Sequence, residues 1–110
     1  MQDIKMRVVG GKYIRRPIIY SLDHKEIRPT KDVVRQGIFN ALGVDVKNRI
    51  ALDLFAGTGA LGIEALSRGA KSATFVDKNQ ESIRLIEQNT TYVEEDILVI
   101  KSDFENFIKK

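Results

Sequence analysis

A glycine loop, Gly57-x-Gly59-x-x-Gly62, constrains the fold of this 110-residue chain more than any other feature. The loop follows a short apolar segment, residues 50–55, which we predict to be a strand, and it opens a helical pattern over residues 60–68. Glycines let a ligand approach the main chain closely, and the N-terminus of the helix offers free N–H groups to an anionic group. A tight turn without a ligand is the alternative, but three glycines at this spacing favour a nucleotide-binding loop.

Strand and helix patterns alternate beyond this loop. A second strand over residues 73–76 ends at Asp77, and Asn79 is the expected N-cap of the helix that follows. A third strand over residues 97–100 ends near Asp103, where a last helix begins. Alternating strands and helices imply parallel strands joined by right-handed crossovers. The predicted fold class is therefore α/β, with a Rossmann-like parallel sheet.

The segment before the loop is predicted to begin with a β-hairpin. Residues 6–20 have two β-rich ends, and the turn falls either at Gly10-Gly11 or around residues 13–16. We therefore divide the chain into a basic N-terminal hairpin and helix over residues 1–45 and a cofactor-binding, Rossmann-like half-domain over residues 46–110.

A helix is predicted between the hairpin and the first strand. It begins near Thr30, the expected N-cap, and stops at Gly43. Gly37 costs about 1 kcal/mol in a helix interior, so it indicates close packing at that position. Apolar residues at four-residue spacing form one stripe that we expect to face the core, namely Val34, Ile38 and Leu42, with Phe39 beside them.

The charge distribution indicates an anionic partner. Residues 1–36 carry nine Lys/Arg against four Asp/Glu, whereas residues 37–110 carry nine against eleven. Such a basic arm is typical of nucleic-acid binding, although a solvated face would have the same composition. The absence of cysteine and the single histidine, His24, exclude cysteine and multi-histidine metal sites. No apolar run approaches the ~20 residues of a membrane span and no signal peptide is visible, so a cytoplasmic protein without a membrane partner is expected.

The acid at the end of the first strand distinguishes between possible ligands. Asp53 lies four residues before Gly57, within a segment that is apolar in typical dinucleotide-binding loops. Burying a carboxylate without a partner is costly, so a cationic ligand group beside the loop would explain this acid. S-adenosylmethionine has an α-ammonium and a sulfonium. An aspartate that only accepts N–H groups of the loop is the alternative, and the two roles can coexist.

Two further acids end the next two strands. Asp77 can accept both hydroxyls of an adenosine ribose, which NAD and S-adenosylmethionine share, and a helix cap with Asn79 is the alternative. Asp103 can accept from an adenine amino group beside Phe104, although an N-cap explains Asp103 equally well. The three acids together favour S-adenosylmethionine over NAD. The predicted cofactor-binding residues are Asp53, Phe55, Ala56, Gly57, Thr58, Gly59, Asp77, Lys78, Asp103 and Phe104.

Several segments resemble a known enzyme family. Asp53-x-Phe55-x-Gly57-x-Gly59 is similar to the first motif of class I S-adenosylmethionine-dependent methyltransferases. Residues 27–42 (IRPTKDVVRQGIFNAL) resemble the more specific RPT-x-D-x-x-R-x-x-x-F-N-x-L signature of RsmD-type 16S ribosomal RNA guanine-N2 methyltransferases. The segments MRVVGGK (residues 6–12) and LGIEALSR (residues 61–68) continue the match, which covers nearly all of the chain.

The resemblance implies a reaction and a partner. The family transfers a methyl group from S-adenosylmethionine to the exocyclic N2 of a guanine in small-subunit ribosomal RNA. The hairpin and the following helix would meet this RNA or close over the cofactor. One departure is visible, because Arg15 stands where the family usually has glycine. The candidates for contact with RNA phosphates are Lys12, Arg15, Arg16, Arg28 and Arg35.

One motif of the resembled family is absent from these 110 residues. Such methyltransferases carry an Asn/Asp-Pro-Pro-aromatic tetrapeptide that holds the target amino group and stacks the flipped base. The only prolines here are Pro17 and Pro29, and neither lies in such a motif. We therefore predict no catalytic residue within this chain, expect the motif downstream of Lys110, and expect no RNA methylation by the chain alone. The first strand would pair with a fourth strand in the family, so its free edge is predicted to favour self-association.

Two other functional classes stay open from the sequence. The glycine loop is compatible with an NAD-type dinucleotide-binding domain of an oxidoreductase. The basic arm is compatible with a non-catalytic RNA-binding module that keeps a vestigial loop. Binding of cofactor, and its dependence on Asp53, would separate these classes.

Overall fold

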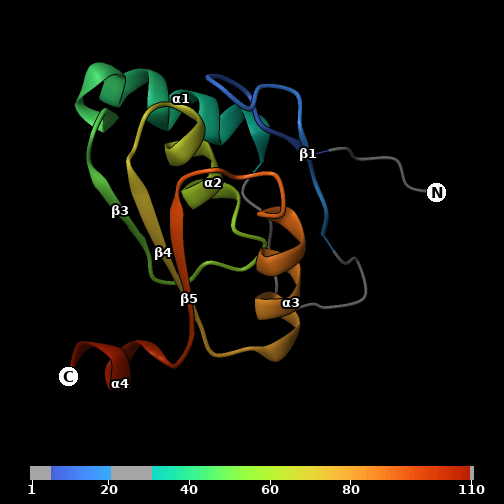
Figure 1. Ribbon diagram of the computed structural model, residues 1–110, viewed down its shortest axis with the longest axis vertical. Coiled ribbons are helices and arrows are strands. Elements are labelled where there is room, and N and C mark those ends of the chain that lie inside the picture. The colour runs from blue at the N-terminus through green and yellow to red at the C-terminus, as the bar shows by residue number, and fades with distance from the viewer. Residues whose placement is uncertain (1–5, 21–30, 110) are drawn as a thin grey trace.

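The computed structural model describes residues 6–20 and 31–109, and its elements alternate in the predicted order (Figure 1). The predicted α/β fold class with a Rossmann-like parallel sheet is confirmed, as is the antiparallel N-terminal hairpin. The elements are β1 (Met6–Arg7), β2 (Pro17–Ile18), α1 (Asp32–Leu42), the 3-10 helix η1 (Gly43–Val46), β3 (Ile50–Asp53), α2 (Ala60–Ser67), β4 (Ser72–Asp77), α3 (Gln80–Asn89), β5 (Asp96–Lys101) and α4 (Phe104–Ile108).

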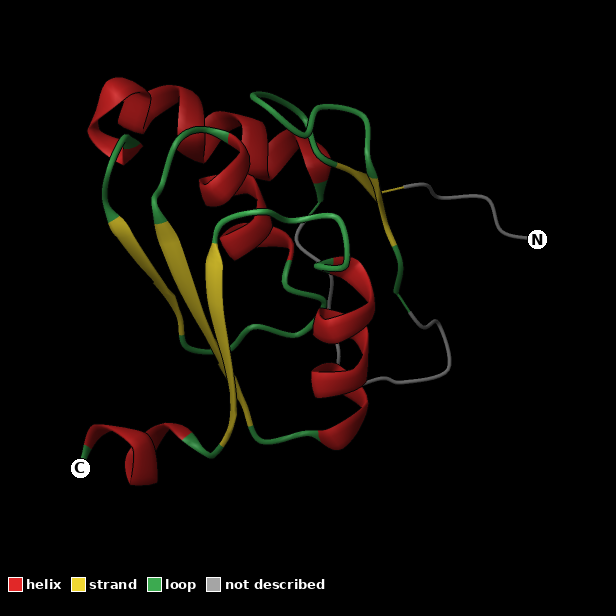
Figure 2. Cartoon of the chain, viewed as in Figure 1, coloured by secondary structure: helices red, strands yellow, loops and turns green. Residues whose placement is uncertain are grey.

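The central sheet has three parallel strands in the order β3-β4-β5. α2 contacts β3 and β4, and α3 contacts β4 and β5, so both helices cover the same face (Figure 2). Alternate strand residues point to the other face, where Leu52 and Leu98 flank Thr74 in register and are 52% and 56% exposed. The sheet therefore has one packed face and one open apolar face among the described residues.

α2 lies very close to the sheet because it carries a glycine at the contact. A methyl group on Gly62 would overlap the Phe75 ring, and Phe75 and Ile63 are both fully buried. Overpacking of a core typically costs 1–3 kcal/mol. The third glycine of the motif is therefore required for packing of the helix on the sheet.

The hairpin packs on the same core as the sheet. Val8 N donates to Arg16 O at 2.9 Å and closes a turn that contains both of the predicted turn segments. Arg15 adopts a left-handed backbone with φ 74°, the conformation that glycine would take most readily. Met6, Val8 and Ile18 are buried in one cluster with residues of α2 and β4. The division near residue 45 stays a prediction, and one apolar core extends across it.

α1 differs from the prediction in its start and in its buried face. Its N-cap is Lys31, not Thr30, and Thr30 itself lies outside the described residues. The predicted apolar stripe faces solvent, because the buried side chains of α1 are Arg35 and Phe39. Gly37 has open space where a side chain would be, so the expected close packing there is also wrong. The stripe residues Val34, Ile38 and Leu42 are 48%, 41% and 45% exposed.

β3 lies at one edge of the sheet. Among the described residues it pairs only with β4, and its Ile50 and Leu52 are exposed. Within residues 6–20 and 31–109, no helix is long and apolar enough to cross a membrane. Self-association through this edge stays a prediction.

Candidate functional site

The glycine loop between β3 and α2 is held by hydrogen bonds to β4 and α3. Gly57 and Gly59 have φ values of 56° and 86°, in the region that other residues rarely adopt. Ala56 N donates to Val76 O at 3.1 Å, which ties the loop to β4. Thr58 is buried, and its carbonyl accepts from Asn89 Nδ2 at 2.9 Å. Ala56 and Thr58 therefore anchor the loop to β4 and α3, whereas the glycines allow its backbone conformation.

Asp53 lies under the first turn of α2. Its Oδ2 accepts from the Gly62 N–H at 3.2 Å. The pKa of Asp53 is raised to about 6, first by burial and then by the charge of Asp77, while the hydrogen bond from the Gly62 N–H opposes the shift. Asp53 therefore accepts a hydrogen bond from the main chain, but its environment still disfavours the negative charge.

Asp77 connects β4 to the glycine loop. Its Oδ2 accepts from Gly57 N at 2.9 Å, and its Oδ1 accepts from Asn79 N at 2.9 Å. Asn79 in turn caps α3 by accepting from Glu81 N at 2.8 Å. Each carboxylate oxygen of Asp77 can accept a second hydrogen bond, so the capping role and a ligand-binding role are compatible.

The third acid has a local role in the structure. Asp103 is the N-cap of α4, with Oδ1 accepting from Asn106 N at 2.7 Å and Oδ2 from Asn106 Nδ2 at 3.0 Å. The neighbouring Phe104 stacks on Phe55 with ring centroids 5.5 Å apart. Phe55 is 76% exposed, so this aromatic pair presents apolar surface beside the loop. Lys78 is exposed directly after β4.

The carboxyl ends of the strands thus bring most of the predicted cofactor residues together. Asp53 and Asp77 lie on either side of the loop, and Ser102 N donates to Asp77 O at 3.0 Å, which joins the ends of β4 and β5. Within residues 6–20 and 31–109, neither Asp53 nor Asp77 forms an ion pair with a lysine or arginine. Two acids without a cationic partner around a glycine loop fit a ligand that carries positive charge.

The basic residues predicted to contact RNA have different environments. Arg15 and Arg16 are exposed in the hairpin, and Arg16 lies over the Tyr92 ring at 4.8 Å. Lys12 is held by two glutamates. Arg28 lies outside the described residues. Arg35 is fully buried, which removes it from the surface candidates.

Arg35 instead belongs to a buried charged network that the sequence did not suggest. Its guanidinium binds Glu64 Oε1 at 2.9 Å, pairs with Asp32, and donates to Arg7 O at 3.0 Å. Glu64 is fully buried and also accepts from Arg68 Nε at 2.8 Å. These contacts join the hairpin, α1 and α2. The central pair, Arg35 and Glu64, is 29 residues apart in the chain, so no local pattern reveals it.

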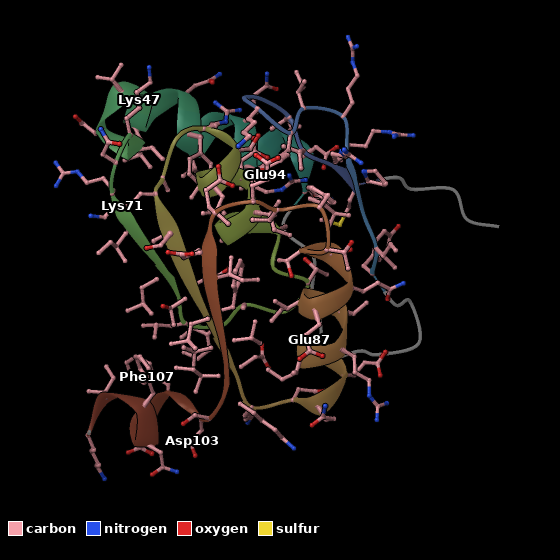
Figure 3. All side chains as sticks on the ribbon, viewed as in Figure 1. Lys47, Lys71, Glu87, Glu94, Asp103 and Phe107 are labelled. Carbon is pink, nitrogen blue, oxygen red and sulfur yellow. The ribbon has the colours of Figure 1, made fainter. Side chains whose placement is uncertain are left out.

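The hairpin tip lies at the opposite end of the sheet from the loop. Lys12 N donates to Ser67 O at 2.7 Å at the end of α2, and the Tyr13 hydroxyl donates to Glu95 just before β5 begins. Figure 3 shows Glu94 at this amino end and Asp103 at the carboxyl end. The six residues of β5 span roughly 20 Å. The tip is therefore too distant to close over the loop, whereas the other end of the hairpin approaches it, because Asn89 bonds both Ile19 and Thr58 O. Closure of the hairpin and the following helix over the cofactor stays a prediction.

Solved structures identify the class of protein that this fold and site define. The chain superposes on yhhF, a methyltransferase candidate from Escherichia coli, with a TM-score of 0.82 and 31% identity, over 96% of this chain and 57% of that one. The class is that of Rossmann-like methyltransferase folds. Within it, the chain belongs to the RsmD family, whose model, described as conserved hypothetical protein 95, matches residues 6–110.

Curated relatives agree with this family. Ribosomal RNA small subunit methyltransferase D of Escherichia coli is 36% identical over 94% of this chain and 52% of its own length. The protein of the same name from Haemophilus influenzae is 35% identical over 77% of this chain and 44% of its own length. The chain thus spans about half the length of the curated relatives it matches.

Proposed function

We propose that the loop of residues 56–59, with Asp53 and Asp77, binds S-adenosylmethionine. The observation that carries this proposal is the environment of Asp53, whose pKa is raised to about 6 mainly by burial. A cationic group of the ligand would offset the cost of the buried carboxylate, whereas the uncharged ribose or adenine of another nucleotide would not. S-adenosylmethionine supplies the methyl group for transfer when it is bound.

The other residues of the site have distinct proposed roles. Asp77 accepts the ribose hydroxyls through the lone pairs that its bonds to Gly57 and Asn79 leave available. Phe55 and Phe104 offer apolar contact to the adenine, and Asp103 accepts from its amino group. Lys78 borders the site. The glycines keep the main chain accessible to the ligand.

We further propose that the protein acts in methylation of small-subunit ribosomal RNA at the N2 amino group of a guanine. The names of the relatives support the RNA substrate. Exposed Arg15 and Arg16 of the hairpin would contact phosphates and position the RNA without reading its sequence. The 110 residues contain no Asn/Asp-Pro-Pro-aromatic motif, so we expect this chain on its own to bind the methyl donor and not to methylate RNA. Transfer of labelled methyl groups to small-subunit RNA by this chain would contradict that expectation.

Calorimetry tests the cofactor proposal directly. S-adenosylmethionine and S-adenosylhomocysteine should bind, and NAD should not. Asp77→Ala should weaken binding of both adenosine ligands, and Asp53→Asn should weaken S-adenosylmethionine more than tenfold, which corresponds to about 1.4 kcal/mol. Asp96→Asn removes an exposed acid at the amino end of β5 and serves as the matched control, with no expected effect. Binding of NAD in preference to both methyl-donor ligands would support the oxidoreductase alternative instead.

A second measurement tests self-association. An edge strand with exposed apolar residues is a template for pairing with another chain. We expect dimers or larger species in sedimentation at high concentration, and Leu52→Lys should reduce them by placing a charge on the open face. A strictly monomeric wild-type chain would contradict this proposal.

A further inference from the structure

The tip of the hairpin is held by two acids in the loop between α3 and β5. Lys12 Nζ donates to Glu94 Oε1 at 2.8 Å and to Glu95 Oε2 at 3.1 Å. The Tyr13 hydroxyl donates to Glu95 Oε1 at 2.7 Å and accepts from Glu94 N at 2.9 Å. Two carboxylates therefore enclose the ammonium group of a residue in the basic arm.

The contacts around this tip are of two kinds. Tyr13 is 6% exposed and packs edge-on against Tyr92 with ring centroids 5.3 Å apart, so it is a buried anchor. The side chains of Lys12 and Glu94 are 48% and 75% exposed. An exposed ion pair contributes little to stability because solvent screens it, so this contact can exchange without loss of the anchor.

The exposed pair has the chemistry of a phosphate contact. Carboxylate oxygens surround the Lys12 ammonium as phosphate oxygens would, and Glu94 has no other ion pair among the described residues. An RNA strand that approaches this end of the sheet would meet Lys12 already neutralised and Glu94 repelling its backbone. Arg15 and Arg16 lie on the same hairpin and remain exposed.

We propose that Glu94 and Glu95 hold Lys12 in place of an RNA phosphate, and that RNA bound by the hairpin displaces Glu94 from Lys12. This inference rests on the RNA substrate of the proposed function. The acidic pair then lowers the affinity for any RNA that reaches only the hairpin. It favours an RNA large enough to contact the hairpin and the glycine-loop end together, which are roughly 20 Å apart along β5.

Fluorescence anisotropy with a labelled RNA stem-loop tests this inference. Glu94→Gln removes the charge and leaves the bond between Tyr13 and Glu95 in place, so it should tighten RNA binding roughly two- to fivefold. Glu87→Gln makes the same change in net charge at an exposed position on α3, as Figure 3 shows, and should not change binding. In a Lys12→Gln background, Glu94→Gln should lose most of its effect because the displaced group is absent.

The possible outcomes separate this inference from the proposed function. Tighter binding by Glu94→Gln alone, lost in the Lys12→Gln background, supports the inference. Equal changes for Glu94→Gln and Glu87→Gln indicate a general charge effect and overturn it, as does a full effect that persists without Lys12. If the wild type and every variant fail to bind RNA, the RNA part of the proposed function fails and the inference fails with it.

Discussion

Acids at the two ends of the parallel sheet have pKa values that are shifted in opposite directions. At the amino end, burial acts to raise the pKa of Glu95, but hydrogen bonds from Tyr13 and Lys12 outweigh burial and lower it. At the carboxyl end, burial dominates and raises the pKa of Asp53 to about 6. Paired acids stabilise the fold, whereas an acid without a cation costs stability in the unliganded chain. The comparison indicates that the acids of the amino end already have partners within the fold, whereas Asp53 at the carboxyl end still lacks a cationic one among the described residues.

The largest expected effect comes from the buried network beside the hairpin. Glu64→Ala should destabilise the chain by about 3–5 kcal/mol, because Arg35 would keep a buried charge with one partner removed. Urea unfolding followed by circular dichroism measures this change. Glu87→Ala, at an exposed position, is the control and should stay within about 0.5 kcal/mol of the wild type. An equal loss of unfolding free energy in the two variants would show that the network does not stabilise the fold.

The second effect has the opposite sign. Asp53→Asn should stabilise the unliganded chain by about 2–3 kcal/mol at pH 7.5, because ionising a carboxyl costs about 1.4 kcal/mol for each unit by which folding raises its pKa. The amide oxygen can still accept from Gly62 N. The same variant should bind S-adenosylmethionine weakly. Lower stability of Asp53→Asn at pH 7.5 would contradict the assigned role of burial.

The pH dependence provides the control for this prediction. Folding raises the pKa of Asp53, so its favourable contribution is fully present below the ordinary pKa near 4 and is lost as pH rises through about 6. The difference in unfolding free energy between the wild type and Asp53→Asn should therefore be small at pH 4, grow up to about pH 6, and stay constant above it. A difference that is independent of pH would exclude ionisation as its cause.

A third prediction concerns the anchor of the hairpin. Tyr13→Phe should cost about 1–3 kcal/mol, because Glu95 loses a donor and the Glu94 N–H loses an acceptor. Tyr92→Phe is a matched control, since the Tyr92 hydroxyl is buried without a hydrogen-bond partner among the described residues. Thermal unfolding should show a clear loss for the first variant and none for the second. Equal melting temperatures would indicate that the amino end is not held by this hydroxyl.

The smallest expected effect is at the turn of the hairpin. Arg15→Gly should stabilise the chain by about 1 kcal/mol, because glycine adopts the left-handed backbone of this position without the steric cost. This change corresponds to a rise of about 4–8 °C in melting temperature for a domain of this size. Ile14→Gly, at the preceding position, should instead lower stability. A loss in both variants would indicate that the arginine side chain contributes more than its backbone costs.

The order of elements and the site around the glycine loop could be predicted from sequence because their signals are local. Gly57 and Gly59 shape the loop in which they lie, and Asp77 and Asn79 accept from N–H groups two residues further on at the start of α3. The bond between Asp77 and Gly57, 20 residues apart, is the exception. The buried face of α1 could not be predicted in this way. Its apolar spacing indicated one face, but the ion pair of Arg35 with Glu64, 29 residues away, buries the other.

The environments of the basic residues also could not be predicted from composition. A count of charges in the first 36 residues treats Lys12, Arg15 and Arg35 alike. The fold gives them three environments: an ion pair with acids 82 and 83 residues away, a strained turn, and a buried network. Only contacts between distant segments distinguish these environments.

The distance in sequence between Tyr13 and Glu95 has a consequence for folding during synthesis. The two residues are 82 positions apart. At ~5–20 residues per second, a ribosome takes about 4–16 s to make the second partner after the first. The two-residue strands of the hairpin are too short to be stable by themselves over that time. The hairpin is therefore synthesised well before Glu95 but reaches its native position only after Glu95 has been made.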